Sequence, residues 1–256
     1  MTNYREINRK AWAYLAQSGC DSSHPYGTNE FAAARQWLDP RRWIPWNNVS
    51  SVLCLACGGG QQAPLFASLG CRVTVADVSP DQLNIDREVA ARYGFEIEVV
   101  EADMLDLSFL YGRGFDLVYQ AISACYVPDV RRLYREVFHV LKCSGYYRVE
   151  HWNPTHLQLP ERRRWDGSAY RITRTHALRE PIPYTPWDKN ADRPGATCWH
   201  FFHPLDALIG GLCDAGFVIV RFGESTNGKL SGEPGSHTHL AAYLPSFFSL
   251  LARRRG

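Results

Sequence analysis

The stretch from Val52 to Gly70, VLCLACGGGQQAPLFASLG, places the strongest constraint on the fold. An apolar run typical of a buried strand breaks into three consecutive glycines and resumes with helical character. Glycines let backbone N–H groups approach a ligand closely, and the N-terminus of a helix favours negatively charged groups. The stretch therefore predicts a strand, a ligand-binding turn and a helix, which together open a βαβ unit.

The alternation of short apolar runs with helical segments continues along the first 150 residues. Further strands are expected over residues 71–76, 96–100, 115–119 and 146–150, with helices over 61–69, 79–93 and 130–141. A helix over 204–215 and strands over 217–222 and 247–252 complete the pattern. Strands that alternate with helices of this length imply a doubly wound α/β sheet.

The expected domain organisation is a single domain that spans residues 1–256. We expect an N-terminal helical cap, a cofactor-binding core, a lid or substrate insertion, and a C-terminal helix with a hairpin; these occupy residues 1–50, 51–151, 152–203 and 204–256. The insertion is rich in proline, arginine and aromatic residues and has no clear period. A long irregular stretch inside a domain is more often a lid or binding segment than a plain connection.

The composition argues against several classes of protein. The formal net charge of +2 is unlike the basic balance of a typical nucleic-acid-binding protein. No apolar run reaches the roughly 18 residues of a membrane span, and the polar first residues differ from a secretory signal. The eight cysteines are scattered, which does not suggest a disulfide framework. We expect a cytoplasmic monomer or homodimer whose partner is a small molecule, with neither nucleic acid nor membrane involved.

The glycine turn alone is compatible with two cofactors. Gly58, Gly60 and Ala63 satisfy the dinucleotide pattern GxGxxA, and Asp77 follows at roughly the 20-residue distance of a ribose-binding acid. An NAD(P)-dependent oxidoreductase would use the same turn. The motif by itself therefore leaves open which cofactor binds there.

Six segments in order carry a resemblance that the glycine turn alone does not. They are VLCLACGGG, VTVADVSPDQL, EIEVVEADMLDL, FDLVYQAIS, VFHVLKCSGYYRV and LCDAGFVIV. In this order and spacing the sequence resembles the class I S-adenosylmethionine-dependent methyltransferases. Within them it is similar to a bacterial small-molecule group with a CLACGGGQQ first motif, whose start matches Asn8, Arg9, Ala11 and Trp12.

The resemblance implies a Rossmann-like sheet of seven strands in the order 3-2-1-4-5-7-6 and S-adenosylmethionine as the cofactor. It also implies that Asp77 binds the ribose, that Asp103 faces the adenine amine and that Met104 lies beside the adenine ring. The cofactor-binding residues that it implies are Ala56, Gly58, Gly60, Gln61, Asp77, Val78, Leu83, Asp103, Met104 and Gln120. The sequence departs from the family at Cys54, where the first strand usually carries an acid, and Gln61 and Gln62 are candidate replacements.

Two residues are candidates for contact with the acceptor. His151 is expected at the carboxyl end of the fifth strand, where open α/β sheets bind ligands, and a histidine there is either a general base or a packing residue. Tyr126 follows the fourth strand and either orients the acceptor or packs. No metal is expected, because the pair His237 and His239 lacks a third ligand at a recognisable spacing.

The expected function is transfer of a methyl group from S-adenosylmethionine to an oxygen or nitrogen atom of a small molecule. The reaction is an SN2 displacement, to which a protein contributes proximity and alignment. Three alternatives stay open at this point. They are an NAD(P)-dependent oxidoreductase, an RNA or protein methyltransferase, and a protein that binds S-adenosylmethionine without catalysis.

Overall fold

A seven-stranded sheet in the order β3-β2-β1-β4-β5-β9-β8 forms the centre of the molecule. The computed structural model describes residues 3–159, 165–177, 180–185 and 197–256. The strands of the sheet are β1 (Ser51–Leu55), β2 (Arg72–Asp77), β3 (Ile97–Glu101), β4 (Phe115–Gln120), β5 (Leu141–Trp152), β8 (Phe217–Glu224) and β9 (Phe247–Arg254). The first five are parallel, and β9 runs antiparallel to both β5 and β8. Counted within this sheet, the order confirms the predicted 3-2-1-4-5-7-6.

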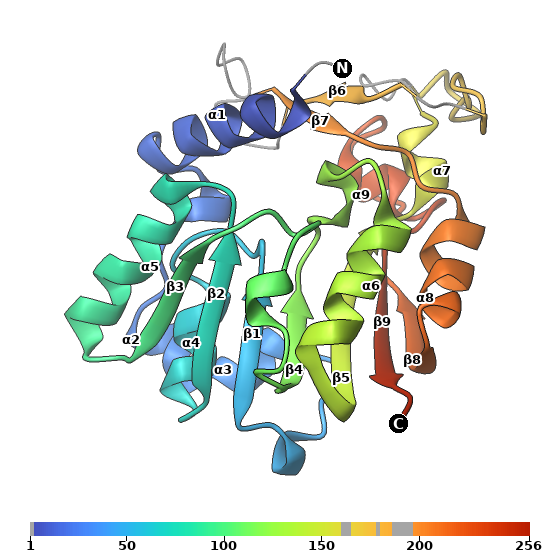
Figure 1. The fold of residues 1–256 in the computed structure, drawn as a ribbon. Helices are drawn as coiled ribbons and strands as arrows, with labels where there is room; N and C mark the ends of the chain where they lie inside the picture. The colour runs from blue at the N-terminus through green and yellow to red at the C-terminus, as the bar shows by residue number, and fades with distance from the viewer. Residues whose placement is uncertain (1–2, 160–164, 178–179, 186–196) are drawn as a thin grey trace.

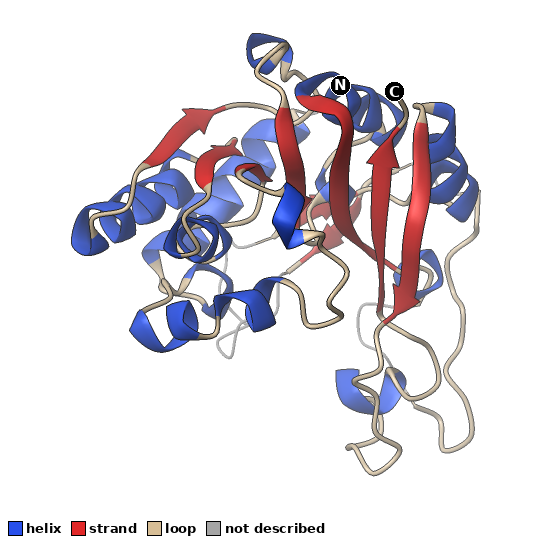
Figure 2. Cartoon of the chain, turned by 90° about the horizontal axis from the view of Figure 1, so that it is seen from below, coloured by secondary structure: helices blue, strands red, loops and turns tan. Residues whose placement is uncertain are grey.

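Helices cover both faces of the sheet (Figures 1 and 2). One face packs against α3 (Ala34–Leu38), α4 (Gln62–Ser68) and α5 (Pro80–Tyr93), and the other against α6 (Val130–Val140) and α8 (Gly211–Asp214). All five residues of β1 are buried, because the central strand of such a sheet is covered on both sides. The two hydrophobic cores that result hold the carboxyl ends of the parallel strands at one edge of the molecule.

The edge of the sheet at the carboxyl ends of the parallel strands is covered by α1 (Tyr4–Gln17) and a separate two-stranded hairpin (Figure 1). The hairpin consists of β6 (Ile182–Tyr184) and β7 (Cys198–His200). Sequence periodicity did not predict it, because three-residue strands are too short to show an alternation. The remaining short helices are α2 (Thr28–Ala32), α7 (Pro154–Leu157) and α9 (His237–Leu240).

Several predicted boundaries differ from those of the structure. The helix expected over 204–215 is a π-helical turn, Asp206–Gly210, that leads into α8. Between residues 28 and 38 the chain forms two short helices, α2 and α3, separated at Ala33, whose φ of −112° and ψ of 20° are not helical. Parts of the predicted insertion at 152–203 lie outside the described residues, so the proposed division into cap, core and insertion stays a prediction. In the part of the chain that the structure describes, no helix is long and apolar enough to cross a membrane.

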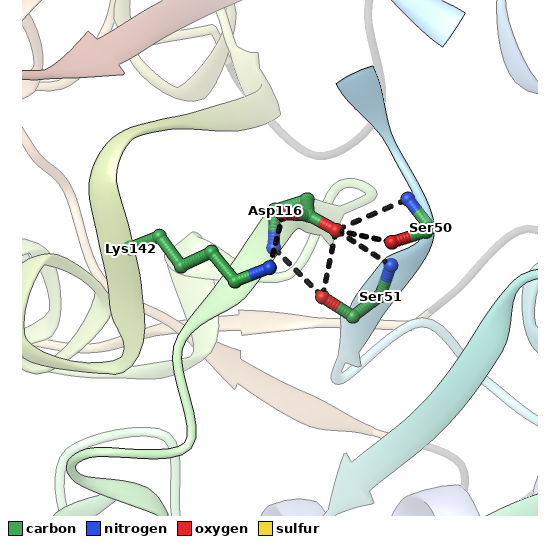
Figure 3. A network of polar contacts seen from close by, with 4 residues as sticks. All are labelled: Ser50, Ser51, Asp116 and Lys142. Atoms are coloured by element: carbon green, nitrogen blue, oxygen red, sulfur yellow. Dashed lines mark hydrogen bonds and ion pairs between the residues drawn. The ribbon is translucent and has the colours of Figure 1, made fainter. Parts of the chain in front are cut away.

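The opposite edge of the sheet is fixed by a partly exposed polar network around Asp116 (Figure 3). One carboxylate oxygen of Asp116 accepts hydrogen bonds from the backbone N–H and hydroxyl groups of Ser50 and Ser51, and the other accepts one from Lys142 at 2.6 Å. Burial raises the pKa of Asp116, but these hydrogen bonds outweigh it and hold the pKa well below the usual value. The network therefore joins the N-terminal ends of β1 and β4, at the edge of the sheet opposite the carboxyl ends of these strands.

Candidate functional site

A cavity of about 230 Å³ lies at the carboxyl ends of the first four strands, beneath α1. The loop after β1 contributes Ala56, Gly58 and Gln61 to its lining, all three of which were predicted to bind the cofactor. A ligand at the carboxyl ends of parallel strands, beside the point where the strand order reverses, is the usual arrangement in open α/β folds. The cavity therefore coincides with the site that the glycine turn predicted.

The glycine loop adopts a backbone that side chains would disfavour. Gly58 and Gly60 each have a φ of +77°, and Ala56 has a φ of +47°. A Cβ atom on Gly59 would overlap the backbone carbonyl of Gln82 in α5. Left-handed φ and close approach to a neighbouring helix are the two properties for which glycine is required. Ala56 therefore places a residue with a side chain in a backbone conformation that glycine would adopt without strain.

Two carboxylates face the cavity from the ends of neighbouring strands. Asp77 ends β2, and one of its oxygens accepts a hydrogen bond of 2.8 Å from the backbone N–H of Ser79. Burial raises the pKa of Asp77 to about 6. Asp103 follows β3, and its carboxylate lies 2.5 Å from Nε of Arg5 in α1. Carboxylates accept hydrogen bonds, so this pair suits a ligand that offers hydroxyl and amine donors.

Two more predicted residues, Val78 and Met104, line the same cavity. Val78 follows Asp77 at the end of β2, and Met104 follows Asp103 after β3. Both side chains supply an apolar surface beside a carboxylate. An apolar wall with a few placed polar groups is the common composition of a cofactor site.

The two glutamines at the start of α4 differ in what they can offer a ligand. The Gln61 amide donates to the backbone carbonyls of Asp21 and His24, at 3.0 and 3.1 Å, so this side chain anchors the chain that precedes the sheet. Oε1 of Gln62 is buried, lines the same cavity and accepts no hydrogen bond from the described residues. An unpartnered buried acceptor fits the ammonium group of an amino-acid cofactor. Cys54, which replaces the usual acid, is buried in β1 and does not line the cavity.

Three predicted cofactor residues lie behind the cavity wall rather than in it. Gly60 donates its N–H to Asp86 at 2.9 Å, and Leu83 is buried in the core beside α4. Gln120 is fully buried at the end of β4, where its amide donates to the Ser123 hydroxyl at 2.9 Å. These residues shape the wall, and the structure does not bring them into contact with the cavity.

His151 lies away from the cavity. Its imidazole is 3% exposed, and Nε2 lies 3.1 Å from the Tyr134 hydroxyl. Burial lowers the pKa of His151 to about 3. The structure therefore packs His151 between the sheet and α6, in keeping with the packing alternative considered for this residue.

Tyr126 does line the cavity, and α1 packs directly against it. The ring of Trp12 meets the ring of Tyr126 edge to face, with centroids 5.5 Å apart. The Asn8 amide donates to the backbone carbonyl of Tyr126 at 3.2 Å. Burial raises the pKa of the Tyr126 hydroxyl well above its usual value, so the phenol remains protonated. Tyr126 can therefore orient a ligand or donate a hydrogen bond to it.

Two further polar residues at the site are not indicated by any local pattern in the sequence. Arg5 pairs with Asp103, and Gln82 accepts the N–H of Gly59 at 2.7 Å. Both contacts join segments far apart in the chain, which no local pattern predicts. Among the described residues, no group of three or more histidine, cysteine, aspartate or glutamate side chains could hold a metal ion.

Comparison with known proteins agrees with this geometry. A family profile described as a methyltransferase domain matches residues 52–145. The uncharacterized methyltransferase YbaJ of Bacillus subtilis is 34% identical over 190 residues, which is 74% of each chain. The ubiquinone/menaquinone biosynthesis C-methyltransferase UbiE of Nitrobacter hamburgensis is 34% identical over 111 residues, 41% of this chain and 42% of that one.

Among solved structures, the crystal structure of an S-adenosylmethionine-dependent methyltransferase from Mesorhizobium loti superimposes with a TM-score of 0.65. It is 25% identical and covers 89% of this chain and 99% of its own. The profile, the relatives and this structure all name methyl transfer, and the structure names S-adenosylmethionine, not a nicotinamide cofactor. The chain therefore belongs to the S-adenosylmethionine-dependent methyltransferases.

Proposed function

We propose that this methyltransferase acts on an oxygen or nitrogen atom of a small molecule. The observation that carries the proposal is the position of α1 over the cavity. The volume of the cavity is about 230 Å³, and α1 covers it with Trp12 packed on Tyr126. A cavity that a helix covers in this way suits a small acceptor better than a nucleic acid or a protein surface, which would need an open groove.

Within this proposal, the two carboxylates hold the nucleoside part of the cofactor. Asp77 accepts the ribose hydroxyls, and Asp103 accepts the adenine amine while Arg5 remains beside it. Met104 and Val78 pack against the rings, and the free Oε1 of Gln62 accepts the ammonium group. These assignments are supported by the positions of the side chains in the cavity lining.

S-adenosylmethionine, when bound, supplies an electrophilic methyl group next to a sulfonium. The residues of this chain contribute alignment and exclusion of water, which are the main protein contributions to an SN2 displacement. Tyr126 is proposed to contact the acceptor, because its ring forms part of the cavity wall. His151 does not reach the cavity, so we propose that it packs the sheet against α6 through its contact with Tyr134.

A second candidate is a carbon acceptor. It is favoured by the name of one relative, the C-methyltransferase UbiE, which matches 41% of this chain. A carbon acceptor would have to be a nucleophilic carbon such as that of an electron-rich ring. The two candidates differ in the atom that carries the new methyl group, so product analysis separates them.

The test is incubation of the purified protein with S-adenosylmethionine labelled with deuterium in the methyl group and a library of small phenols, amines and carboxylic acids. We expect S-adenosylhomocysteine to form only with particular acceptors and the label to appear on oxygen or nitrogen. Label on carbon would favour the second candidate. Binding of S-adenosylmethionine with no product from any member would contradict an acceptor of these classes.

A further inference from the structure

His200, the last residue of β7, is fully buried, and neither of its ring nitrogens forms a hydrogen bond with the residues that the structure describes. Burial lowers the pKa of His200 to about 3, so the ring is neutral near pH 7. A neutral imidazole carries one N–H donor and one acceptor lone pair. Leaving either group without a partner in the protein interior destabilises the folded state, and such groups are rare in native proteins. An apolar side chain would avoid this cost, so the histidine calls for an explanation.

Aromatic rings surround this histidine. Tyr184 stacks on it with ring centroids 4.1 Å apart and an angle of 22° between the planes. The ring centroid of Trp152 lies 6.2 Å from that of the imidazole. The ring of Tyr126 meets the imidazole edge to face, with centroids 5.0 Å apart. All three neighbours offer flat surfaces, and no ion pair with His200 is formed by the described residues. The surroundings favour a neutral, planar molecule over a charged or flexible one.

The histidine stands directly behind the wall of the cavity. Tyr126, its edge-to-face neighbour, lines the cavity. The backbone on both sides of His200 is tied to the same wall. Asn8, which lines the cavity, hydrogen-bonds both backbone groups of Trp199, and the N–H of Phe201 donates to the Cys125 carbonyl at 2.7 Å. The Tyr126 ring therefore contacts His200 and also lines the cavity, whereas His200 itself does not line it.

We propose that His200 is the polar contact of an acceptor-binding pocket that opens from the cavity when the Tyr126 side chain rotates. The ligand is a neutral aromatic molecule with a hydroxyl or amine group. Its ring lies among Tyr184, Trp152 and Tyr126, and its O–H or N–H donates to the imidazole lone pair. This inference rests on the proposed function, because it names the class of acceptor for the same methyl transfer.

The test compares phenol with toluene. The two molecules have similar shapes, but toluene carries a methyl group in place of the hydroxyl group of phenol. Both are titrated into protein saturated with S-adenosylhomocysteine, and binding is followed by NMR in protein whose histidines are labelled with nitrogen-15. We expect phenol to bind at least tenfold more tightly than toluene. His200→Phe should reduce this ratio to about one, whereas His176→Phe, an exposed histidine of the same insertion, should leave it unchanged.

Three results would overturn the proposal: equal affinity for the two probes, no binding of phenol, or a ratio that survives in His200→Phe. If His200→Phe does not fold, NMR measurements on the unmodified protein still test the proposal. Phenol must then shift the ring nitrogen resonances of His200 while toluene does not, and unshifted resonances would count against the pocket. Saturation with S-adenosylhomocysteine is checked first by calorimetry. Failure of the unmodified protein to bind S-adenosylhomocysteine would contradict the proposed function. Normal binding of S-adenosylhomocysteine without a preference for phenol would contradict this pocket alone.

Discussion

Asp77 is the residue on which cofactor binding is expected to depend most. Its carboxylate is buried at the end of β2 and faces the cavity. Asp77→Ala removes the carboxylate that we propose accepts the ribose hydroxyls, so it should weaken binding of S-adenosylhomocysteine at least tenfold, about 1.4 kcal/mol. Calorimetric titration measures the affinity of each protein for S-adenosylhomocysteine. Asp106→Ala, which removes an exposed carboxylate outside the cavity lining, is the control. Unchanged affinity in Asp77→Ala would show that the ribose lies elsewhere.

Asp86 gives the stability of the protein a pH dependence. Burial raises its pKa to about 7, and one of its oxygens has no hydrogen-bond partner among the described residues. The unfolded chain has the ordinary aspartate pKa of about 3.9, so the folded state binds the proton more tightly. Stability from this group is therefore fully present below pH 4 and is lost as the pH rises through 7.

Asp86→Asn should remove this contribution while keeping an oxygen that accepts the Gly60 N–H. We expect urea unfolding of the unmodified protein to show a fall in stability between about pH 4 and pH 7, and we expect Asp86→Asn to flatten that fall. Asp77, whose pKa is also raised by burial, contributes a fall of the same sign that the variant retains. Equal slopes in the two proteins would rule out Asp86 as a source.

Helix α5 joins the glycine loop to the N-terminal segment through one side chain. Gln82 accepts the N–H of Gly59 at 2.7 Å and donates to the Trp12 carbonyl at 3.1 Å and the Ser23 hydroxyl at 2.7 Å. Ser79 caps the helix by accepting the backbone N–H of Gln82. The glycine loop, which we propose binds the cofactor, and helix α1, which covers the cavity, are therefore joined through the same residue.

Gln82→Leu should leave these groups unpartnered and loosen the loop. We expect a loss of about 1–3 kcal/mol in the free energy of unfolding together with a fivefold or greater loss of affinity for S-adenosylhomocysteine. Gln17→Leu removes an exposed glutamine that donates to Asp81, and it should leave the affinity unchanged. A Gln82→Leu protein that is less stable but binds the cofactor normally would limit Gln82 to a structural role.

Local patterns in the sequence predict those parts of the molecule that depend on neighbouring residues. The strands of the sheet, their order and the glycine loop follow from periodicity, from the glycines and from the family resemblance. The contacts that close the site join residues far apart, such as Asn8 and Trp199, and depend on how α1 and the β6–β7 hairpin meet above the sheet (Figure 1). His151 illustrates the difference, because its strand was predicted correctly but its side chain turns away from the cavity.

The whole molecule is a sheet whose carboxyl edge holds a cofactor site beneath a helix and a hairpin. The most direct test is a calorimetric titration of the purified protein with S-adenosylmethionine, S-adenosylhomocysteine and NAD(P)H. We predict binding of the first two in the micromolar range and no binding of NAD(P)H. Binding of NAD(P)H without binding of S-adenosylmethionine would contradict the assignment of Asp77, Asp103 and the glycine loop to a methyl donor.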